Sequence, residues 1–339
     1  MTANQATVGY SIQGPRATTP EVAVSLSRRT LLLSGAGATL LGGLGAYELV
    51  QDGALPGKYF LARLDGACGS APPTPAGPPP ARRVARFYSA YRRRDVETVT
   101  LVPPGKASLR GLRVVIGLHG AGGNAAGMAE LVAPAMTAAR VTGFAVICVD
   151  GGNTYWHDRA DGDDPAGMIT YEVLPRAAAQ GLATRRVGLT GLSMGGYGAI
   201  LLAEQLATPS MLRSHAGTGA PPSTPAGPLP AVAAVAALSP AIFASYADAE
   251  AAGRSSFDSQ ADFARNNVFA GLEALRQVPT WIACGADDPF QPETSRLLAR
   301  LSALTGRPSG PGILSGCHDD AFWGRNLPTA LSFIAAHMA

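Results

Sequence analysis

The stretch Arg186-Val-Gly-Leu-Thr-Gly-Leu-Ser-Met-Gly-Gly-Tyr-Gly198 joins a short apolar run, a G-x-S-x-G pentapeptide and the start of a helical pattern. This order is typical of a nucleophile elbow, a sharp strand-to-helix turn that exposes a serine hydroxyl above a sheet. Gly191 and Gly195 lie two residues before and after the serine, where strand and helix must approach closely. The stretch therefore predicts Ser193 as a nucleophile at a helix N-terminus, whose free N–H groups stabilise negative charge.

An acid and a base follow two later apolar runs. A nucleophilic serine needs a base, and the base needs a carboxylate that orients it. The run Thr280–Gly285 leads into Asp287 and Asp288, and the run Gly312–Gly316 leads to His318. We therefore predict His318 as the base and Asp288 as the acid. Asp287 is the competing acid, because a shift of one residue reverses the side chain in extended backbone.

A glycine-rich loop precedes the elbow in the sequence. Leu112–Leu118 has the composition of a buried strand, and His119-Gly-Ala-Gly-Gly-Asn124 follows it. Such a loop leaves backbone N–H groups open to the site, as an oxyanion hole requires. The expected donors are the N–H groups of Met194, directly after the nucleophile, and of Ala121. A phosphate-binding loop is a poor alternative, because the Lys-Ser/Thr ending of that motif is missing.

Four segments give the chain a family resemblance. They are Gly117-Leu-His-Gly-Ala-Gly-Gly-Asn124, Asp150-Gly-Gly, Gly191-Leu-Ser-Met-Gly-Gly-Tyr-Gly198 and Cys317-His-Asp-Asp-Ala-Phe-Trp323. Together they resemble the esterase D-like and mycolyltransferase-like branch of the α/β hydrolases, from about Val99 to the C-terminus. The resemblance implies the same triad and the same two oxyanion donors. Mycolyltransferases have small residues where this chain has Gly195-Gly196-Tyr197, and this departure favours ester hydrolysis over transfer of a long acyl chain.

The wider pattern alternates strands with helices. An antiparallel pair is expected near 85–91 and 96–102, and parallel strands near 112–118, 143–150, 186–190, 233–239, 279–285 and 311–316. Helices are expected at 125–140, 168–181, 194–207, 293–305 and 324–338. Nearly continuous apolar strands separated by helices predict an α/β-hydrolase fold. Its mostly parallel sheet is covered by helices on both faces, without a large cap domain. The predicted site residues then lie at the carboxyl ends of the strands, where such sheets bind ligands.

Five further residues are candidates for the substrate cleft: His119, Trp156, His157, Phe322 and Trp323. They adjoin the predicted oxyanion loop, the strand end that follows it, and the predicted base.

Composition limits the partners of the chain. Of its 339 residues 47% are hydrophobic and 15% charged, and the net charge is only +3, which excludes nucleic acid and acidic polymers as expected partners. Arg82-Arg83 and Arg92-Arg93-Arg94 are interpreted as the solvated face of an early hairpin. The acidic loop Asp158–Asp164 lacks the calcium-loop pattern and is interpreted as solvated. No cysteine pair has zinc spacing, so neither a metal nor another cofactor is expected.

The N-terminal region predicts export. Ser27-Arg-Arg-Thr-Leu-Leu-Leu33 resembles the twin-arginine signal, and a weakly apolar stretch follows to about Ala46. A clear A-x-A cleavage site is missing, so the segment either is removed or remains as an anchor that associates with the membrane. We expect the twin-arginine export machinery as a partner and an extracellular or cell-envelope location. The expected organisation is a signal or anchor at 1–50, a Pro/Gly-rich linker at 51–82 and a catalytic domain at 83–339. Within the linker, residues 69–80 are expected not to pack against the domain, and the insert 208–230 is expected to form a surface loop or partial lid.

The four cysteines fall into two groups. Cys148 and Cys284 lie within predicted strands and are interpreted as inert core thiols. In an oxidising compartment, a bridge between Cys68 and Cys317 would hold the N-terminal arm beside the predicted base. A bridge between Cys284 and Cys317 is the alternative, because pairing does not follow from sequence.

These predictions describe an exported serine hydrolase that cleaves carboxylic esters through an acyl-enzyme. One alternative is an acyltransferase, in which a sugar or another alcohol replaces water. A second is a catalytically silent envelope-binding protein on a hydrolase fold. The same triad also performs peptide hydrolysis, so a peptidase is a further but less favoured hypothesis.

Overall fold

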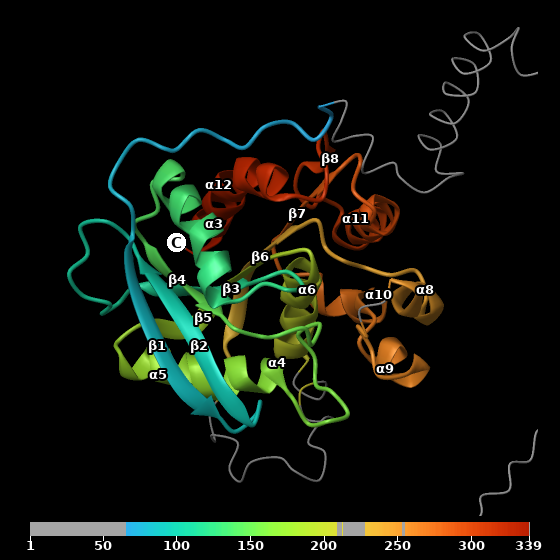
Figure 1. Cartoon of the computed structure of the whole chain (residues 1–339), viewed down its shortest axis with the longest axis horizontal. Helices are drawn as coiled ribbons and strands as arrows, with labels where there is room; N and C mark the ends of the chain where they lie inside the picture. The colour runs from blue at the N-terminus through green and yellow to red at the C-terminus, as the bar shows by residue number, and fades with distance from the viewer. Residues whose placement is uncertain (1–65, 209–211, 213–227, 253–254, 339) are drawn as a thin grey trace, which may run out of the picture. The chain divides into compact units, whose positions relative to one another are not determined.

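The computed structural model describes residues 66–208, 212, 228–252 and 255–338 (Figure 1). The predicted twin-arginine signal, its cleavage or retention as an anchor, and the first part of the predicted linker lie outside the described residues. Most of the 208–230 insert does too.

A single sheet of eight strands organises the described residues, in the order β1-β2-β4-β3-β5-β6-β7-β8 (Figure 1). The strands are β1 Ala81–Ser89, β2 Arg94–Val102, β3 Arg113–Leu118, β4 Phe144–Val149, β5 Ala183–Leu192, β6 Ala231–Leu238, β7 Thr280–Gly285 and β8 Gly312–Leu314. β1 and β2 form an antiparallel hairpin, β2 pairs antiparallel with β4, and the strands from β3 to β8 are parallel. All eight predicted strands are present.

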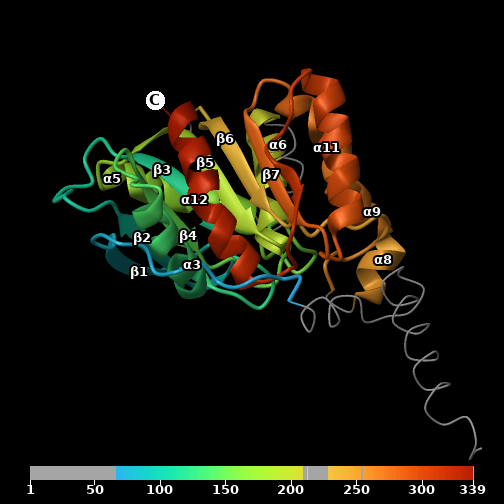
Figure 2. The same ribbon diagram turned by 90° about the horizontal axis from the view of Figure 1, so that it is seen from above.

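Helices cover both faces of the sheet (Figures 1 and 2). The longer ones are α3 Ala125–Ala138, α6 Met194–Ala207, α11 Gln291–Thr305 and α12 Asp320–His337. The shorter ones are α4 Pro165–Met168, the π-helical turn η1 Ile169–Val173, α5 Leu174–Ala179, α8 Tyr246–Ala251, α9 Gln260–Arg265, α10 Val268–Gly271 and the 3₁₀ turn η2 Leu272–Leu275. α3 and α12 form one apolar layer with the sheet, and α5, α6 and α11 form the other.

This burial explains the apolar runs of the sequence. Every residue of β4 and of β7 is buried, as expected for parallel strands covered on both faces. The predicted α/β-hydrolase fold is therefore confirmed. The segment α8–η2 was not predicted, because its helices are too short to show a helical period. Serine and asparagine caps begin three of them: Ser245, Ser259 and Asn267 accept from a backbone N–H in the first turn.

The described part of the linker packs against the domain, contrary to our expectation. Arg325 of α12 donates to the backbone oxygens of Ser70, at 2.7 Å, and Cys68, at 2.9 Å. Further along, Thr137 of α3 donates to the oxygen of Pro78 at 3.4 Å. A proline-rich arm has few backbone donors but many free carbonyl oxygens, and side chains of the domain bind these.

The acidic loop and one of the arginine clusters also differ from expectation, because they bind each other. Arg92 is 2% exposed, and its guanidinium donates to both carboxylate oxygens of Asp163 at 2.7 and 2.8 Å. It also donates to the oxygen of Asp150 at 2.7 Å, and Asp164 caps α4. Through Arg92, the loop is thus bound to the β1–β2 hairpin and to the end of β4.

Within the described ranges, no helix is both long and apolar enough to cross a membrane.

Candidate active site

Ser193 occupies a strained turn between β5 and α6. Its φ of 55° and ψ of −120° lie in a region that non-glycine residues rarely adopt. A Cβ at Gly191 would overlap the backbone of Gly195, and a Cβ at Gly195 would overlap the oxygen of Leu118. The two glycines of the pentapeptide therefore allow β5, α6 and β3 to meet beneath the serine.

The structure brings Ser193, His318 and Asp288 into one hydrogen-bonded chain. His318 Nε2 lies 2.8 Å from Ser193 Oγ, and His318 Nδ1 lies 2.8 Å from Asp288 Oδ2. A proton on Nδ1 satisfies the carboxylate and leaves Nε2 free to accept the serine proton. The Asp288 side chain is fully buried, and its other oxygen accepts from the N–H of Phe290 at 2.8 Å.

The neighbouring Asp287 has a different position. Its backbone N–H donates to the oxygen of Gly316 at 3.0 Å, while the N–H of Ala286 donates to the oxygen of Leu314 at 2.7 Å. These bonds hold the loop after β7 against the loop after β8. Asp287 thus helps through its backbone to align the two loops, and Asp288 supplies the carboxylate that faces His318.

Two aromatic rings flank the imidazole of His318. The ring centroid of Phe290 lies 5.2 Å away, and that of Trp323 lies 5.1 Å away in an edge-on arrangement. The two rings cover part of the imidazole, whose side chain is 18% exposed. Phe290 was not predicted to lie at the site, because nothing in the sequence around it distinguishes it from a core residue.

The glycine-rich loop after β3 lies against the nucleophile. A Cβ at Gly120 would meet Ser193 Cβ at 3.3 Å. The N–H of Gly122 donates to Asn153 Oδ1 at 2.7 Å, and that of Gly123 donates to the oxygen of Gly120. Within the described residues, the N–H of Ala121 has no acceptor.

Met194 supplies a second such N–H group. As the first residue of α6, it has no intrahelical acceptor for its N–H. Ala121 follows Gly120, which packs against Ser193, and Met194 follows Ser193 in the chain. Each of the two has a backbone N–H without a described acceptor, and an oxyanion hole requires two such donors.

His119 and Trp156 hold the backbone of the glycine-rich loop after β3 through hydrogen bonds. His119 Nε2 accepts from the N–H of Gly151 at 3.0 Å, so Nδ1 carries the proton and donates to the oxygen of Gly120 at 2.8 Å. Trp156 Nε1 donates to the oxygen of His119 at 3.2 Å. The Trp156 ring fills a slot between Gly151 and Gly198, where any Cβ would overlap it.

Four of the five predicted cleft residues are buried and offer a ligand little surface. His119 is 2% exposed, Trp156 1%, and His157 and Phe322 0%. Their place in the cleft wall therefore stays a prediction, since the structure shows these four side chains buried, with Phe322 in the apolar layer of α3 and α12. Trp323 is partly exposed and lies against His318.

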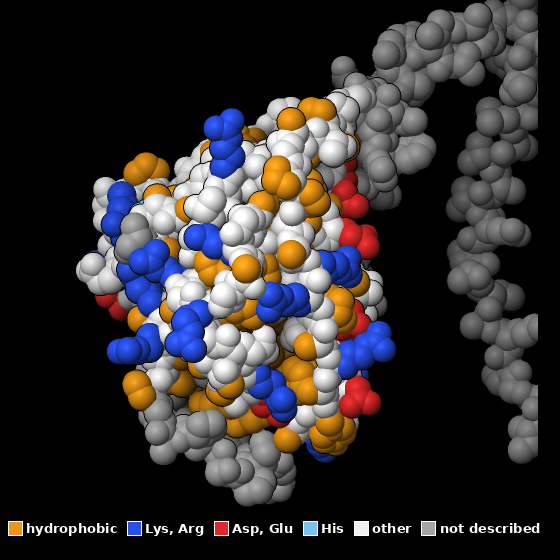
Figure 3. All heavy atoms as spheres, turned by 90° about the vertical axis from the view of Figure 1, so that its left-hand side faces the viewer, with side chains coloured by type: hydrophobic (Ala, Val, Ile, Leu, Met, Phe, Trp, Pro, Cys, Tyr) orange, Lys and Arg blue, Asp and Glu red, His pale blue; other side chains and the backbone are white. Residues whose placement is uncertain are grey.

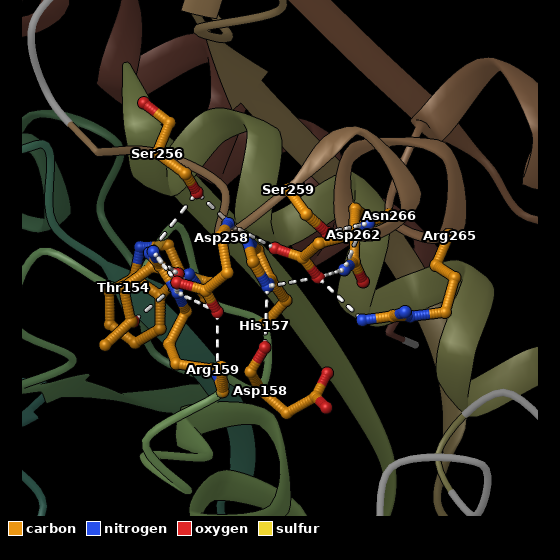
Figure 4. Close-up of polar contacts among 12 residues, drawn as sticks. Thr154, His157, Asp158, Arg159, Ser256, Asp258, Ser259, Asp262, Arg265 and Asn266 are labelled. Atoms are coloured by element: carbon orange, nitrogen blue, oxygen red, sulfur yellow. Dashed lines mark hydrogen bonds and ion pairs between the residues drawn. The ribbon is translucent and has the colours of Figure 1, made fainter. Parts of the chain in front are cut away.

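His157 belongs to a polar network that joins the loop after β4 to α9 (Figure 4). Its Nδ1 lies 2.9 Å from the oxygen of Asp158, and its Nε2 lies 3.1 Å from that of Ser256. Burial lowers the pKa of His157, against the opposing effect of Asp262, whose carboxylate lies 3.8 Å away. This histidine therefore has a structural role.

A salt bridge reinforces the same junction. Arg159 pairs with Asp258 at 2.6 Å (Figure 4). It also donates to the backbone oxygen of Ser255 at 2.8 Å. The segment leading into α9 is thus tied to the loop that carries Trp156.

Cys68 and Cys317 form a disulfide across 249 residues of sequence. Cys317 directly precedes His318, so the bridge fixes the N-terminal arm beside the predicted base. Cys148 and Cys284 are free and buried. Burial raises the pKa of both thiols, and the nearby Asp288 raises that of Cys284 further. The alternative Cys284–Cys317 pair is not formed.

One group in the described residues has donor atoms close enough for a metal ion: Cys68, Cys317 and Asp319. The two sulfur atoms are bonded to each other, and Asp319 caps α12 by accepting from the N–H of Phe322 at 2.9 Å. These atoms are therefore engaged within the protein.

No family model matches the chain, and no curated protein matches it in sequence. Solved structures do match. The fluorophosphonate-binding serine hydrolase F of Staphylococcus aureus aligns over 76% of this chain and 99% of its own, with a TM-score of 0.57 and 17% identity. The fold is that of the α/β hydrolases.

Two other solved structures agree with this fold. S-formylglutathione hydrolase from Agrobacterium tumefaciens aligns over 78% of this chain and 100% of its own, with a TM-score of 0.57 and 17% identity. A thermostable esterase from Pseudomonas putida aligns over 82% and 89%, with a TM-score of 0.57 and 16% identity. The structural neighbours are thus esterase D-like and S-formylglutathione hydrolase-like proteins, in agreement with one part of the resemblance inferred from the sequence motifs.

Proposed function

We propose that the protein is a serine esterase that hydrolyses carboxylic esters through an acyl-enzyme on Ser193. The observation that carries this proposal is the chain of two 2.8 Å contacts from Ser193 Oγ through His318 to Asp288. The free N–H groups of Ala121 and Met194 beside the serine support it. The serine hydrolases and esterases among the structural neighbours agree with it.

The geometry accounts for acylation. Ser193 Oγ attacks the ester carbonyl carbon as its proton moves to His318 Nε2. Asp288 accepts a hydrogen bond from Nδ1–H and stabilises the imidazolium that forms. The N–H groups of Ala121 and Met194 bind the carbonyl oxygen as it becomes an oxyanion, and loss of one such donor costs about 100- to 1000-fold in rate. When the tetrahedral intermediate collapses, the ester C–O bond breaks and the leaving alkoxide takes the proton from Nε2.

Deacylation uses the same groups in reverse. Water gives a proton to His318 Nε2 and attacks the acyl carbon, and the second oxyanion occupies the same two donors. Collapse releases the carboxylic acid and returns the proton to Ser193 Oγ. An alcohol in place of water would give acyl transfer, so the choice between hydrolysis and transfer depends on which hydroxyl reaches the acyl-enzyme.

A fluorophosphonate probe tests the proposal directly. We expect stoichiometric labelling of Ser193, loss of labelling in Ser193→Ala, and turnover of p-nitrophenyl esters that disappears in the same variant. Absence of labelling in a folded protein would favour a silent binding protein on this fold. Product analysis with an activated ester plus trehalose or another sugar distinguishes hydrolysis from acyl transfer. If the acylated sugar is the main product, the activity is acyl transfer and not hydrolysis.

We further propose that the chain is exported by the twin-arginine machinery and works outside the cytoplasm. Ser27-Arg-Arg-Thr30 and the apolar stretch after it support this. The disulfide between Cys68 and Cys317 agrees with an oxidising compartment. Export that persists after Arg28→Lys and Arg29→Lys substitution, measured by cell fractionation, would contradict the proposal.

A further inference from the structure

The outermost strand of the sheet has a free edge. β1 pairs with β2 along its whole length, and no described strand pairs with its other side. Side chains alternate between the two faces of a strand. Arg82, Val84, Arg86 and Tyr88 therefore share one face of β1, and Arg83 and Phe87 lie on the other.

Two of these side chains are apolar and exposed. Val84 is 55% exposed and Tyr88 62%, and they are the large hydrophobic residues that the described part of the chain leaves exposed. They lie four residue steps apart along the extended strand, or about 13 Å. Scattered exposed apolar residues are ordinary, but here both lie on one face of one edge strand.

Arginines lie beside this apolar pair on β1, while Glu97 and Asp95 of β2 lie opposite Arg86 and Tyr88. Arg82 and Arg83 are exposed and form no ion pair with any described carboxylate, and Arg86 pairs with Glu97 while 78% exposed. On the other face of the strand, Arg176 of α5 lies 4.2 Å over the ring of Phe87. Figure 3, which views the molecule from the β1 and β2 side, shows Lys and Arg side chains spread over this face and Asp and Glu side chains mainly near its margins.

We propose that the outer edge of β1 binds an anionic lipid surface. Phosphate headgroups match the arginines, and the acyl layer just beneath them accepts Val84 and the ring of Tyr88, a side chain that favours the lipid–water interface. An extended acidic peptide could add to the strand edge, but it offers no apolar layer to these two side chains. The net charge of the whole chain is only +3, so the attraction is local to this edge.

Vesicle co-sedimentation of the full chain tests the proposal. We expect binding to phosphatidylglycerol/phosphatidylcholine vesicles, much weaker binding to phosphatidylcholine alone, and weakening by 0.5 M salt. The double variant Arg82→Gln/Arg83→Gln should bind about 30-fold more weakly, since each arginine near an anionic surface contributes about fivefold. Val84→Ser/Tyr88→Ser should also weaken binding, and this loss should persist at high salt.

A matched variant controls for net charge. Arg300→Gln/Arg307→Gln removes the same charge from α11 and the turn that follows it, beside the opposite end of the sheet, and should bind as the wild type does. All variants should keep esterase activity, because none of these residues touches the site. Equal binding by wild type and Arg82→Gln/Arg83→Gln would place any lipid affinity elsewhere in the chain and overturn the proposal. Binding of polyglutamate without vesicle binding, or a dimer that forms through β1, would also overturn it.

Discussion

Substituting alanine for Gly198 places a methyl group against the indole of Trp156. The new Cβ would lie 2.5 Å from Trp156 Cγ and 2.6 Å from its Cβ, closer than such contacts occur in proteins. Trp156 is 1% exposed, and its ring already meets the backbone of Gly151 on another side. The indole must therefore move, and it carries the hydrogen bond to the backbone oxygen of His119 at the base of the proposed oxyanion loop.

The expected change in folding free energy combines a packing cost with a gain in helix propensity, and the expected change in kcat follows from movement of the loop that Trp156 contacts. Overpacking a core costs about 1–3 kcal/mol of folding free energy, and replacing a helical glycine by alanine returns up to about 1 kcal/mol. We therefore expect Gly198→Ala to lower the melting temperature by a few degrees. Because complete loss of an oxyanion donor costs about 100- to 1000-fold, a displaced loop should lower kcat by about 10- to 100-fold, with a smaller effect on KM.

Steady-state kinetics on p-nitrophenyl acetate, the rate of fluorophosphonate labelling and a thermal melt measure these effects together. Gly127→Ala in α3 is the matched control, because its Cβ would meet only Asn124 Oδ1, at an ordinary 3.7 Å. Wild-type kcat in a folded Gly198→Ala protein would refute the reasoning that Trp156 holds the oxyanion loop. Equal losses of kcat in Gly198→Ala and Gly127→Ala would show that the effect does not depend on the contact with Trp156.

Four other substitutions test three separate parts of the structure. Asp288→Asn should lower kcat by about 1000- to 10,000-fold through loss of the imidazole's carboxylate partner, while Asp287→Asn should change it less than fivefold, and the reverse order would reassign the acid. Burial raises the pKa of Glu204 well above its usual 4.5, so this residue lowers stability as pH rises above that value. Glu204→Gln should therefore match the wild type in urea denaturation near pH 4 and exceed it increasingly toward pH 7, by at most about 1.4 kcal/mol per pH unit; a pH-independent difference would contradict this. Asp163→Asn leaves the Arg92 guanidinium buried without its carboxylate and should cost about 3–5 kcal/mol in urea denaturation, whereas a loss below 1 kcal/mol would mean that Arg92 is solvated.

The sequence was most informative where chemistry restricts the choice of residue. Only glycine fits at 191 and 195, because backbone oxygens of other elements lie where a Cβ would be. The central parallel strands could be predicted because burial on both faces removes polar residues from them. The positions of Asp288 and His318 at one edge of the sheet could be predicted because each follows a parallel strand, and parallel strands place their carboxyl ends at one edge.

Other features depend on contacts between distant segments, which no local pattern records. Arg92 stands in a run of three arginines, yet Asp163, 71 residues later, draws it into the core. The proline-rich arm gave no sign of its contacts with Arg325, because the acceptors are backbone oxygens that every residue carries. The choice between Asp287 and Asp288 also depended on tertiary structure, since the turn after β7 decides which carboxylate faces His318.

His119 and Trp156, which are buried near the site, explain why the sequence motifs extend beyond the three residues of the proposed triad. His119 and Trp156 were expected to meet the substrate, and the structure shows that their polar atoms bind the backbone of the loop after β3 and of Gly151. A backbone donor stabilises an oxyanion only if it is held in place before the charge develops. The cost of that rigidity is visible in the strained backbone of Trp156, with a φ of 61°, and in the requirement for glycine at 151 and 198. His119 and Trp156 beneath the proposed oxyanion loop are thus constrained by packing almost as tightly as the proposed catalytic residues.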